Sequence, residues 1–131
     1  MNPTQQGRLV QLAIEARDMA YAPYSNFRVG VALLTRQGDI YQGVNVENRS
    51  LGLTICAERT AAATAVSQGQ KDFVAIGIAS SGGVTPCGAC RQFLAEFSDD
   101  LTVLLVDVET GNTVRETTLN ELLPDRFTEF G

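Results

Sequence analysis

The stretch TICAERTAAATAV (residues 54–66), followed by PCGACRQFLAEF (residues 86–97), decides how this chain folds and what it can do. Alanine dominates the first stretch and Gly69 lies just beyond it. We therefore predict a helix over residues 56–66, with Thr54 as its N-cap. The second stretch carries its cysteines at the start of another predicted helix, so both helices begin close to thiols.

Strand patterns surround these two helices. The runs FVAIGIA (73–79) and LTVLLV (101–106) are continuously apolar, as expected of strands that are buried on both faces. They flank the second predicted helix, residues 88–97. Upstream, residues 29–34 and 40–46 are separated by a polar turn and predict a β-hairpin.

The ends of the chain add two further helices. Apolar residues recur at helical spacing over residues 5–20, and residues 119–122 predict a short final helix after a turn at 109–112. Helices that alternate with strands predict an α/β fold with helices on both faces of one sheet. The strands in its second half should be parallel.

The composition is that of an ordinary globular protein. The chain has 131 residues, 44% of them apolar, which predicts one domain spanning residues 1–131. Ten basic against fifteen acidic residues give a net charge of −5, which disfavours a nucleic acid polymer or an anionic membrane surface as partner. The first residues lack a signal-peptide pattern, so we expect a cytoplasmic protein.

The cysteine and histidine counts narrow the chemistry further. Three cysteines without a signal peptide argue against a disulfide framework. Histidine is absent, which excludes a Ser-His or Cys-His nucleophilic pair within one chain. A transition-metal site in this protein must therefore use thiolates and carboxylates.

Cys56, Cys87 and Cys90 are the candidate metal ligands. Three protein ligands suit a catalytic zinc site, in which the fourth position is left for water, whereas structural zinc sites use four. Helix N-termini favour thiolates because their dipoles attract negative charge. Glu58 follows closely enough to move protons beside the metal. Arg59 can offset the negative charge of three thiolates.

Other interpretations of single residues stay open at this point. A lone cysteine is usually a small buried hydrophobe, and Cys87 with Cys90 would also suit a redox dithiol. A glutamate in a first helical turn is often there only to complement the helix dipole. The combination is more specific, because C-x-E followed by P-C-x-x-C matches the thiolate form of the zinc deaminase signature.

The chain resembles the small cytidine deaminases along nearly its whole length. Five motifs carry the resemblance in the same order: APYSNFRVG (22–30), GVNVEN (43–48), CAERTA (56–61), PCGACRQ (86–92) and LLP (122–124). The resemblance implies a three-layer α-β-α sandwich around a mixed five-stranded sheet. It also implies a homotetramer with sites near the subunit interfaces.

The resemblance further implies a hydrolytic reaction on a small nucleoside. Cytidine and 2′-deoxycytidine would become uridine and 2′-deoxyuridine with release of ammonia, a step of pyrimidine salvage. One zinc ion per chain would be held by Cys56, Cys87 and Cys90. Glu58 would be the catalytic proton shuttle, and Arg59 would donate hydrogen bonds to the thiolates.

Four residues are implied to bind the substrate. Asn45 and Glu47 would hydrogen-bond the sugar hydroxyls, Phe27 would pack beside the base, and the backbone of Ala57 would contact it. Taken without the resemblance, Asn45 could simply end a strand, Glu47 could be a solvated charge, and Phe27 could be a core residue.

The chain also departs from the family pattern. Leu51 stands where the family commonly has a tyrosine that contributes to a neighbour's pocket, and Arg49 replaces a smaller residue. Phe127 resembles a C-terminal aromatic that reaches a neighbouring site. The departure at Leu51 leaves open the deamination of another cytosine nucleoside, such as a nucleoside antibiotic. The Cys87/Cys90 dithiol leaves open a non-catalytic zinc-binding or thiol-redox protein.

Overall fold

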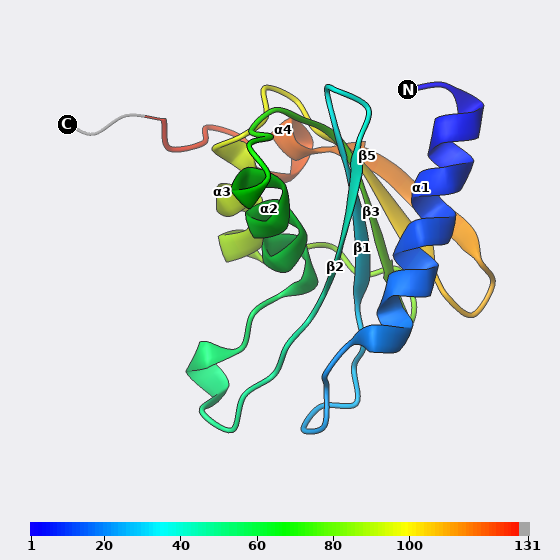
Figure 1. The fold of residues 1–131 in the computed structure, drawn as a ribbon, viewed down its shortest axis with the longest axis vertical. Coiled ribbons are helices and arrows are strands. Elements are labelled where there is room, and N and C mark those ends of the chain that lie inside the picture. The colour runs from blue at the N-terminus through cyan, green and yellow to red at the C-terminus, as the bar shows by residue number, and fades with distance from the viewer. Residues whose placement is uncertain (129–131) are drawn as a thin grey trace.

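A mixed five-stranded sheet forms the centre of the computed structural model, which describes residues 1–128. Its strand order is β2-β1-β3-β4-β5 (Figure 1). The strands are β1 (Gly30–Thr35), β2 (Ile40–Val44), β3 (Phe73–Ser80), β4 (Thr102–Asp107) and β5 (Asn112–Thr118). Only β3 and β4 pair in parallel; the other neighbouring strands are antiparallel. The predicted mixed sheet with parallel strands in its second half is confirmed.

Helices cover both faces of the sheet, which completes the predicted three-layer sandwich (Figure 1). One face carries α1 (Pro3–Ala16), which is followed by the 3₁₀ turn η1 (Arg17–Met19). The other face carries α2 (Ala57–Ser67), α3 (Gly88–Ala95) and α4 (Leu119–Leu122). Within residues 1–128, no helix is long and apolar enough to cross a membrane.

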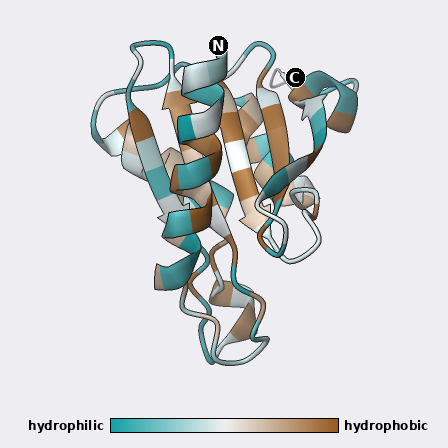
Figure 2. Cartoon of the chain, turned by 90° about the vertical axis from the view of Figure 1, so that its right-hand side faces the viewer, coloured by the Kyte–Doolittle hydropathy of each residue, from teal (hydrophilic) through white to brown (hydrophobic). Residues whose placement is uncertain are grey.

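The central strands are apolar throughout because each of their faces packs against a helix layer. In β3, Ile76 and Ile78 pack in the cluster beneath α2 and α3. Ala75 and Ala79, which point the opposite way, pack in the cluster beneath α1 with Leu9. Figure 2 shows this concentration of hydrophobic residues on the middle strands behind α1.

Several helix boundaries differ from the prediction, including the end of α3, which is Ala95 rather than residue 97. The first helix starts at Pro3, because Asn2 forms a capping box with Gln5, and it gives way to η1 after Ala16. Thr54 was predicted as the N-cap of α2, and this is wrong. Its hydroxyl instead accepts a hydrogen bond from the backbone of Asn48, at 3.3 Å.

The residue pattern of the sequence did not by itself predict strand β5. Its sequence, NTVRETT, is polar and mostly exposed, because it lies at the edge of the sheet. An edge strand with one open side needs little apolar character, so periodicity gives no warning of it. Only the resemblance, with its five strands, implied it.

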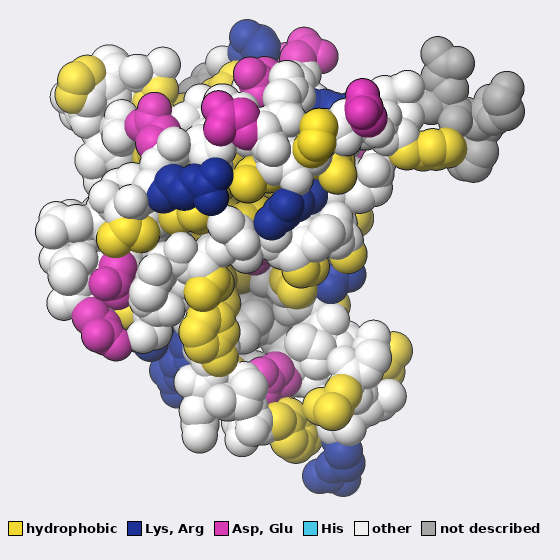
Figure 3. Space-filling view, turned by 180° about the vertical axis from the view of Figure 1, so that it is seen from behind, with side chains coloured by type: hydrophobic (Ala, Val, Ile, Leu, Met, Phe, Trp, Pro, Cys, Tyr) yellow, Lys and Arg dark blue, Asp and Glu magenta, His cyan; other side chains and the backbone are white. Residues whose placement is uncertain are grey.

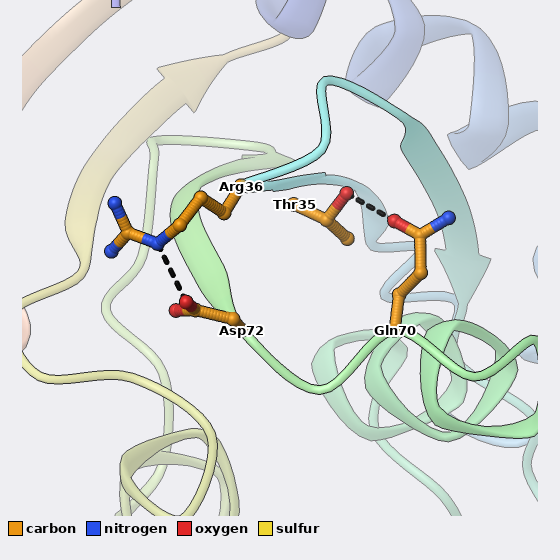
Figure 4. A network of polar contacts seen from close by, with 4 residues as sticks. All are labelled: Thr35, Arg36, Gln70 and Asp72. Carbon is orange, nitrogen blue, oxygen red and sulfur yellow. Dashed lines mark hydrogen bonds and ion pairs between the residues drawn. The ribbon is translucent and has the colours of Figure 1, made fainter.

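A polar network joins the turn of the β1–β2 hairpin to the segment that leads from α2 into β3 (Figure 4). Arg36 forms an ion pair with Asp72, and the hydroxyl of buried Thr35 hydrogen-bonds the side chain of Gln70. The ion pair is exposed and therefore contributes little to stability. The network fixes the end of α2 that lies away from the cysteines.

Candidate active site

A cavity of about 310 Å³ lies where α2 begins, beside the loops that extend beyond the sheet. Of the predicted catalytic, ligand and substrate-binding residues, most line it. The lining comprises Ser25, Phe27, Val29, Asn45, Glu47, Thr54, Cys56, Ala57, Glu58, Ile78, Val84, Thr85 and Cys87. Cys90 is fully buried, and its thiol lies next to that of Cys87. The structure thus brings together residues from four motifs that are separate in the sequence.

The three thiols form a compact cluster. The Sγ atoms of Cys56 and Cys87 lie 3.9 Å apart, and those of Cys87 and Cys90 lie 3.4 Å apart. All three sulfur atoms are within 4.8 Å of one another. Tetrahedral zinc with Zn–S bonds of about 2.3 Å requires sulfur atoms roughly 3.8 Å apart. The cluster therefore fits one zinc ion.

Helix starts place these thiols. Cys56 is the N-cap of α2 and Cys87 is the N-cap of α3, and neither side chain is used to cap its own helix. Cys90 lies in the first turn of α3. All three thiols therefore lie near positive ends of helix dipoles, where thiolates are favoured.

Two of the three thiols, Cys56 and Cys90, have pKa values that are shifted in opposite directions. Hydrogen bonds from Cys90 and Arg59 lower the pKa of Cys56 to about 5. The guanidinium Nη2 of Arg59 donates to this sulfur at 3.6 Å. The pKa of Cys90 is raised, first by its interaction with Cys56 and then by burial. Cys56 is thus more readily ionised than Cys90, and zinc would displace the thiol protons on binding.

Glu58 is an unusual carboxyl group. It lies in the first turn of α2 and is only 5% exposed, yet it lines the cavity. Burial raises its pKa, and the negative charge of Cys56 raises it further. A buried carboxyl group with a raised pKa, aimed into a cavity, is suited to accepting and returning protons.

Arg59 contacts the thiols and does not line the cavity. Besides its bond to Cys56, its Nε atom is buried without a hydrogen-bond partner within the described part of the chain. Its cationic side chain therefore acts chiefly on the sulfur atoms, and its pKa is raised by that contact.

Asn45 lies directly after β2 and lines the cavity from a different element than the thiols. It is 8% exposed, and its amide is largely occupied. Oδ1 accepts from the backbone N–H of Val29 at 3.0 Å, and Nδ2 donates to the carbonyl of Phe27 at 2.8 Å. Asn45 thus holds the segment that carries Phe27, and one N–H of its amide remains.

Glu47 holds the same loop from its other end. Its Oε1 accepts backbone hydrogen bonds from Tyr24, at 2.9 Å, and from Ser25, at 3.2 Å. Its Oε2 accepts from the Ser25 hydroxyl. The hydrogen bond from the Ser25 hydroxyl is the main cause of its lowered pKa.

Close packing of α2 on β2 fixes the position of Cys56 and Glu58 relative to Asn45. A Cβ atom at Gly43 would lie 2.5 Å from the carbonyl oxygen of Ala57 and 2.5 Å from the backbone nitrogen of Ala61. One turn into α2, the hydroxyl of Thr60 donates to the carbonyl of Val44, at 2.8 Å, and accepts from its N–H, at 3.0 Å. Gly43 and Thr60 both lie within motifs of the sequence, but the motifs alone indicated no role for either residue.

Three residues that the sequence singled out lie away from this cavity. Leu51 is in the 3₁₀ turn η2 (Leu51–Leu53) and is 69% exposed. Arg49 is also exposed. Phe127 is 63% exposed, and its carbonyl accepts from Gln92 on α3. Within one chain, none of them lines the cavity.

Three thiols that fit one zinc ion, beside a buried carboxyl group in a cavity sized for a small molecule, define a candidate zinc hydrolase. The chain belongs to the cytidine and deoxycytidylate deaminases, because residues 3–106 match the family model of their zinc-binding region. The prediction of a deaminase with zinc as its cofactor is thereby confirmed at the level of the family.

Individual relatives agree with this assignment. The chain is 48% identical to a cytidine deaminase of Halalkalibacterium halodurans over 122 residues, which is 92% of each chain. It is 46% identical to a probable cytidine deaminase of Dictyostelium discoideum, covering 98% of this chain and 88% of the relative. The crystal structure of cytidine deaminase from Burkholderia pseudomallei superposes with a TM-score of 0.87 at 44% identity, covering 97% of this chain and 100% of that one.

Proposed function

We propose that this protein hydrolyses cytidine and 2′-deoxycytidine to uridine and 2′-deoxyuridine, releasing ammonia. The observation that carries the proposal is the cavity itself, because Cys56, Cys87 and Glu58 line it together with Asn45 and Glu47. Residues suited to the reaction and residues suited to substrate binding therefore line the same cavity. Its volume of about 310 Å³ is at the lower end of small-molecule sites.

Cys56, Cys87 and Cys90 are the residues that would hold the zinc ion. When bound, zinc would lower the pKa of a water molecule toward neutrality and so supply a nucleophile at ordinary pH. Three thiolates leave such a site negative, and the guanidinium of Arg59, 3.6 Å from Cys56, partly compensates that charge.

Glu58 would carry the protons of the reaction. It would take one proton from the attacking water and deliver a proton to N3 of the cytosine ring, so that C4 becomes more electrophilic. A second transfer would protonate the departing amino group, which leaves as ammonia. Its burial supports this role, because burial raises its pKa and so favours the uptake of a proton that it can later return.

Asn45 and Glu47 would bind the sugar. After their bonds within the protein, Asn45 has one amide N–H left and Glu47 has one acceptor position left on Oε2. A hydroxyl group both donates and accepts, so a sugar hydroxyl would match this pair. Phe27 would pack beside the base and the backbone of Ala57 would contact it, since both line the cavity.

A homotetramer with sites near the subunit interfaces is part of the same proposal. Exposed apolar side chains gather on the loops that extend beyond the sheet, among them Tyr21, Leu51 and Leu53. Figure 3 shows hydrophobic surface on this protruding end. A neighbouring chain would cover it, and Leu51 and Phe127 would then face a neighbour's cavity. We also propose a cytoplasmic location and a role in pyrimidine salvage.

An ultraviolet assay of cytidine conversion, run beside zinc analysis, tests the proposal. We expect about one zinc ion per chain and turnover of cytidine and 2′-deoxycytidine to uracil nucleosides. Turnover confined to a modified cytosine nucleoside would replace the proposed substrate. Metal-free protein that forms a reversible Cys87–Cys90 disulfide would favour a thiol-redox protein instead.

A further inference from the structure

The hydroxyl of Ser25 joins two parts of the cavity that the proposed function uses separately. It donates to the carboxylate of Glu47 and accepts from the backbone N–H of Phe27, at 3.0 Å. All three residues line the cavity. One small side chain therefore connects the proposed sugar-binding carboxylate to the aromatic residue proposed to lie beside the base.

Ser25 decides which part of the Glu47 carboxylate stays available. Oε1 is occupied by two backbone N–H groups, those of Tyr24 and Ser25. Oε2 receives only the Ser25 hydroxyl, so it keeps one acceptor position. Without that hydroxyl, the carboxylate could rotate and its remaining acceptor would lose a fixed direction.

Phe27 is held at both of its backbone polar groups. Its N–H donates to Ser25, and its carbonyl accepts from Asn45 at 2.8 Å. Between Ser25 and Phe27, Asn26 has a φ of 58°, in the left-handed region, which makes a tight turn that needs such bonds to persist. The loop and the end of β2 thus brace each other.

We propose that Ser25 is a positioning residue that aligns Glu47 for a sugar hydroxyl of the nucleoside. This inference rests on the proposed function, and Ser25 itself takes no part in the chemistry at the ring. The effect of replacing Ser25 on kcat/KM should therefore depend on whether the substrate carries the hydroxyl that donates a hydrogen bond to Glu47.

The test compares Ser25→Ala with wild type on 2′-deoxycytidine and on 2′,3′-dideoxycytidine, which lacks the remaining ring hydroxyl. We expect kcat/KM for 2′-deoxycytidine to fall about tenfold, mainly through KM, because a hydrogen bond to a charged group loses its alignment. For 2′,3′-dideoxycytidine we expect a change of less than about twofold. Ser25→Thr, which keeps the hydroxyl, should restore most of the loss.

Two controls separate this role from a general one. Ser67→Ala removes a hydroxyl that bonds only within α2, to Thr64, and should leave both substrates unaffected. Calorimetric binding of both nucleosides to Ser25→Ala and to its parent, each carrying Glu58→Gln so that turnover is blocked, should show the same dependence on the hydroxyl.

Equal losses on the two nucleosides, in turnover and in binding, would overturn the role of Ser25 and leave the proposed function standing. Unchanged kcat/KM for 2′-deoxycytidine in Ser25→Ala would do the same. Wild-type protein that neither binds nor converts either nucleoside would overturn the proposed function, and the role of Ser25 with it.

Discussion

Two groups of residues at the cavity are built in different ways; we call the thiols with Glu58 the reaction side, and Asn45 with Glu47 the binding side. The thiols and Glu58 come from the first turns of α2 and α3, which pack on the sheet. Asn45 and Glu47 follow the end of β2 and are held by hydrogen bonds to a neighbouring loop. The reaction side is thus fixed by a packed core, whereas the binding side is fixed by polar contacts near solvent. Substitutions on the reaction side should affect metal binding and kcat, and those on the binding side should affect KM.

Removing a thiol should have the largest effect. Cys90→Ser removes a fully buried thiol that we propose as a zinc ligand, with little change in size. We expect zinc content to fall from about one ion per chain to a small fraction, with loss of turnover. Elemental analysis of the purified variant, with circular dichroism as a control for folding, measures this. A folded variant that keeps its full zinc content would show that Cys90 is not a ligand.

Glu58→Gln should separate proton transfer from metal binding. The amide keeps the shape of the side chain but cannot shuttle protons, so we expect kcat for cytidine to fall by about 10²–10⁴-fold with zinc content unchanged. Steady-state kinetics beside zinc analysis measures both. Turnover at the wild-type rate would remove Glu58 from the mechanism.

Gly43→Ala should disturb the contact that joins the two sides. Its methyl group would lie 2.5 Å from backbone atoms of α2, which should cost about 1–3 kcal/mol in the free energy of unfolding. Gly7→Ala in α1 is the matched control, because a Cβ there meets nothing within 4 Å and should be neutral or slightly stabilising. Urea unfolding of both variants measures this difference in stability. Equal unfolding midpoints for Gly43→Ala and Gly7→Ala would show that α2 can shift without loss of stability.

Glu47→Gln should affect binding more than chemistry. The amide gives up the charge that accepts the hydrogen bonds of the loop and of the proposed sugar hydroxyl, so we expect KM for cytidine to rise about 10–100-fold with a smaller change in kcat. A variant with unchanged KM and reduced kcat would place Glu47 with the reaction side instead.

The pH dependence of stability should show the smallest effect. The hydrogen bonds of Glu47 lower its pKa in the folded protein, so its contribution to stability is present above the pKa of the unfolded chain, about 4.3. It is lost as the pH falls through the lowered folded value. The difference in Tm between wild type and Glu47→Gln should therefore narrow as the pH falls below about 4. A difference that widens on acidification would contradict this.

The reaction side could be predicted from the sequence better than the binding side. Cys56, Glu58 and the cysteines of the second motif are rare residue types at fixed spacing, and zinc chemistry explains why they occur together. Ser25 and Thr60 gave no such signal. Their roles depend on hydrogen bonds to segments distant in the sequence, and serine and threonine are common in loops and helix starts for many other reasons.

The fold shows the same division. Buried strands such as β3 and β4 follow from continuous apolar runs, whereas the polar edge strand β5 has no comparable pattern. The N-cap of α2 also escaped prediction. Threonine is the better capping residue by preference, but Thr54 is engaged by Asn48, and the helix starts at Cys56, whose thiol remains available to the cluster.

The most direct test of this division is a comparison of kcat and KM for cytidine in Glu58→Gln and Glu47→Gln. We expect Glu58→Gln to lose kcat with KM near the wild-type value, and Glu47→Gln to lose affinity while retaining most of kcat. Equal losses in the same parameter for both variants, or cytidine turnover unaffected by either, would contradict it.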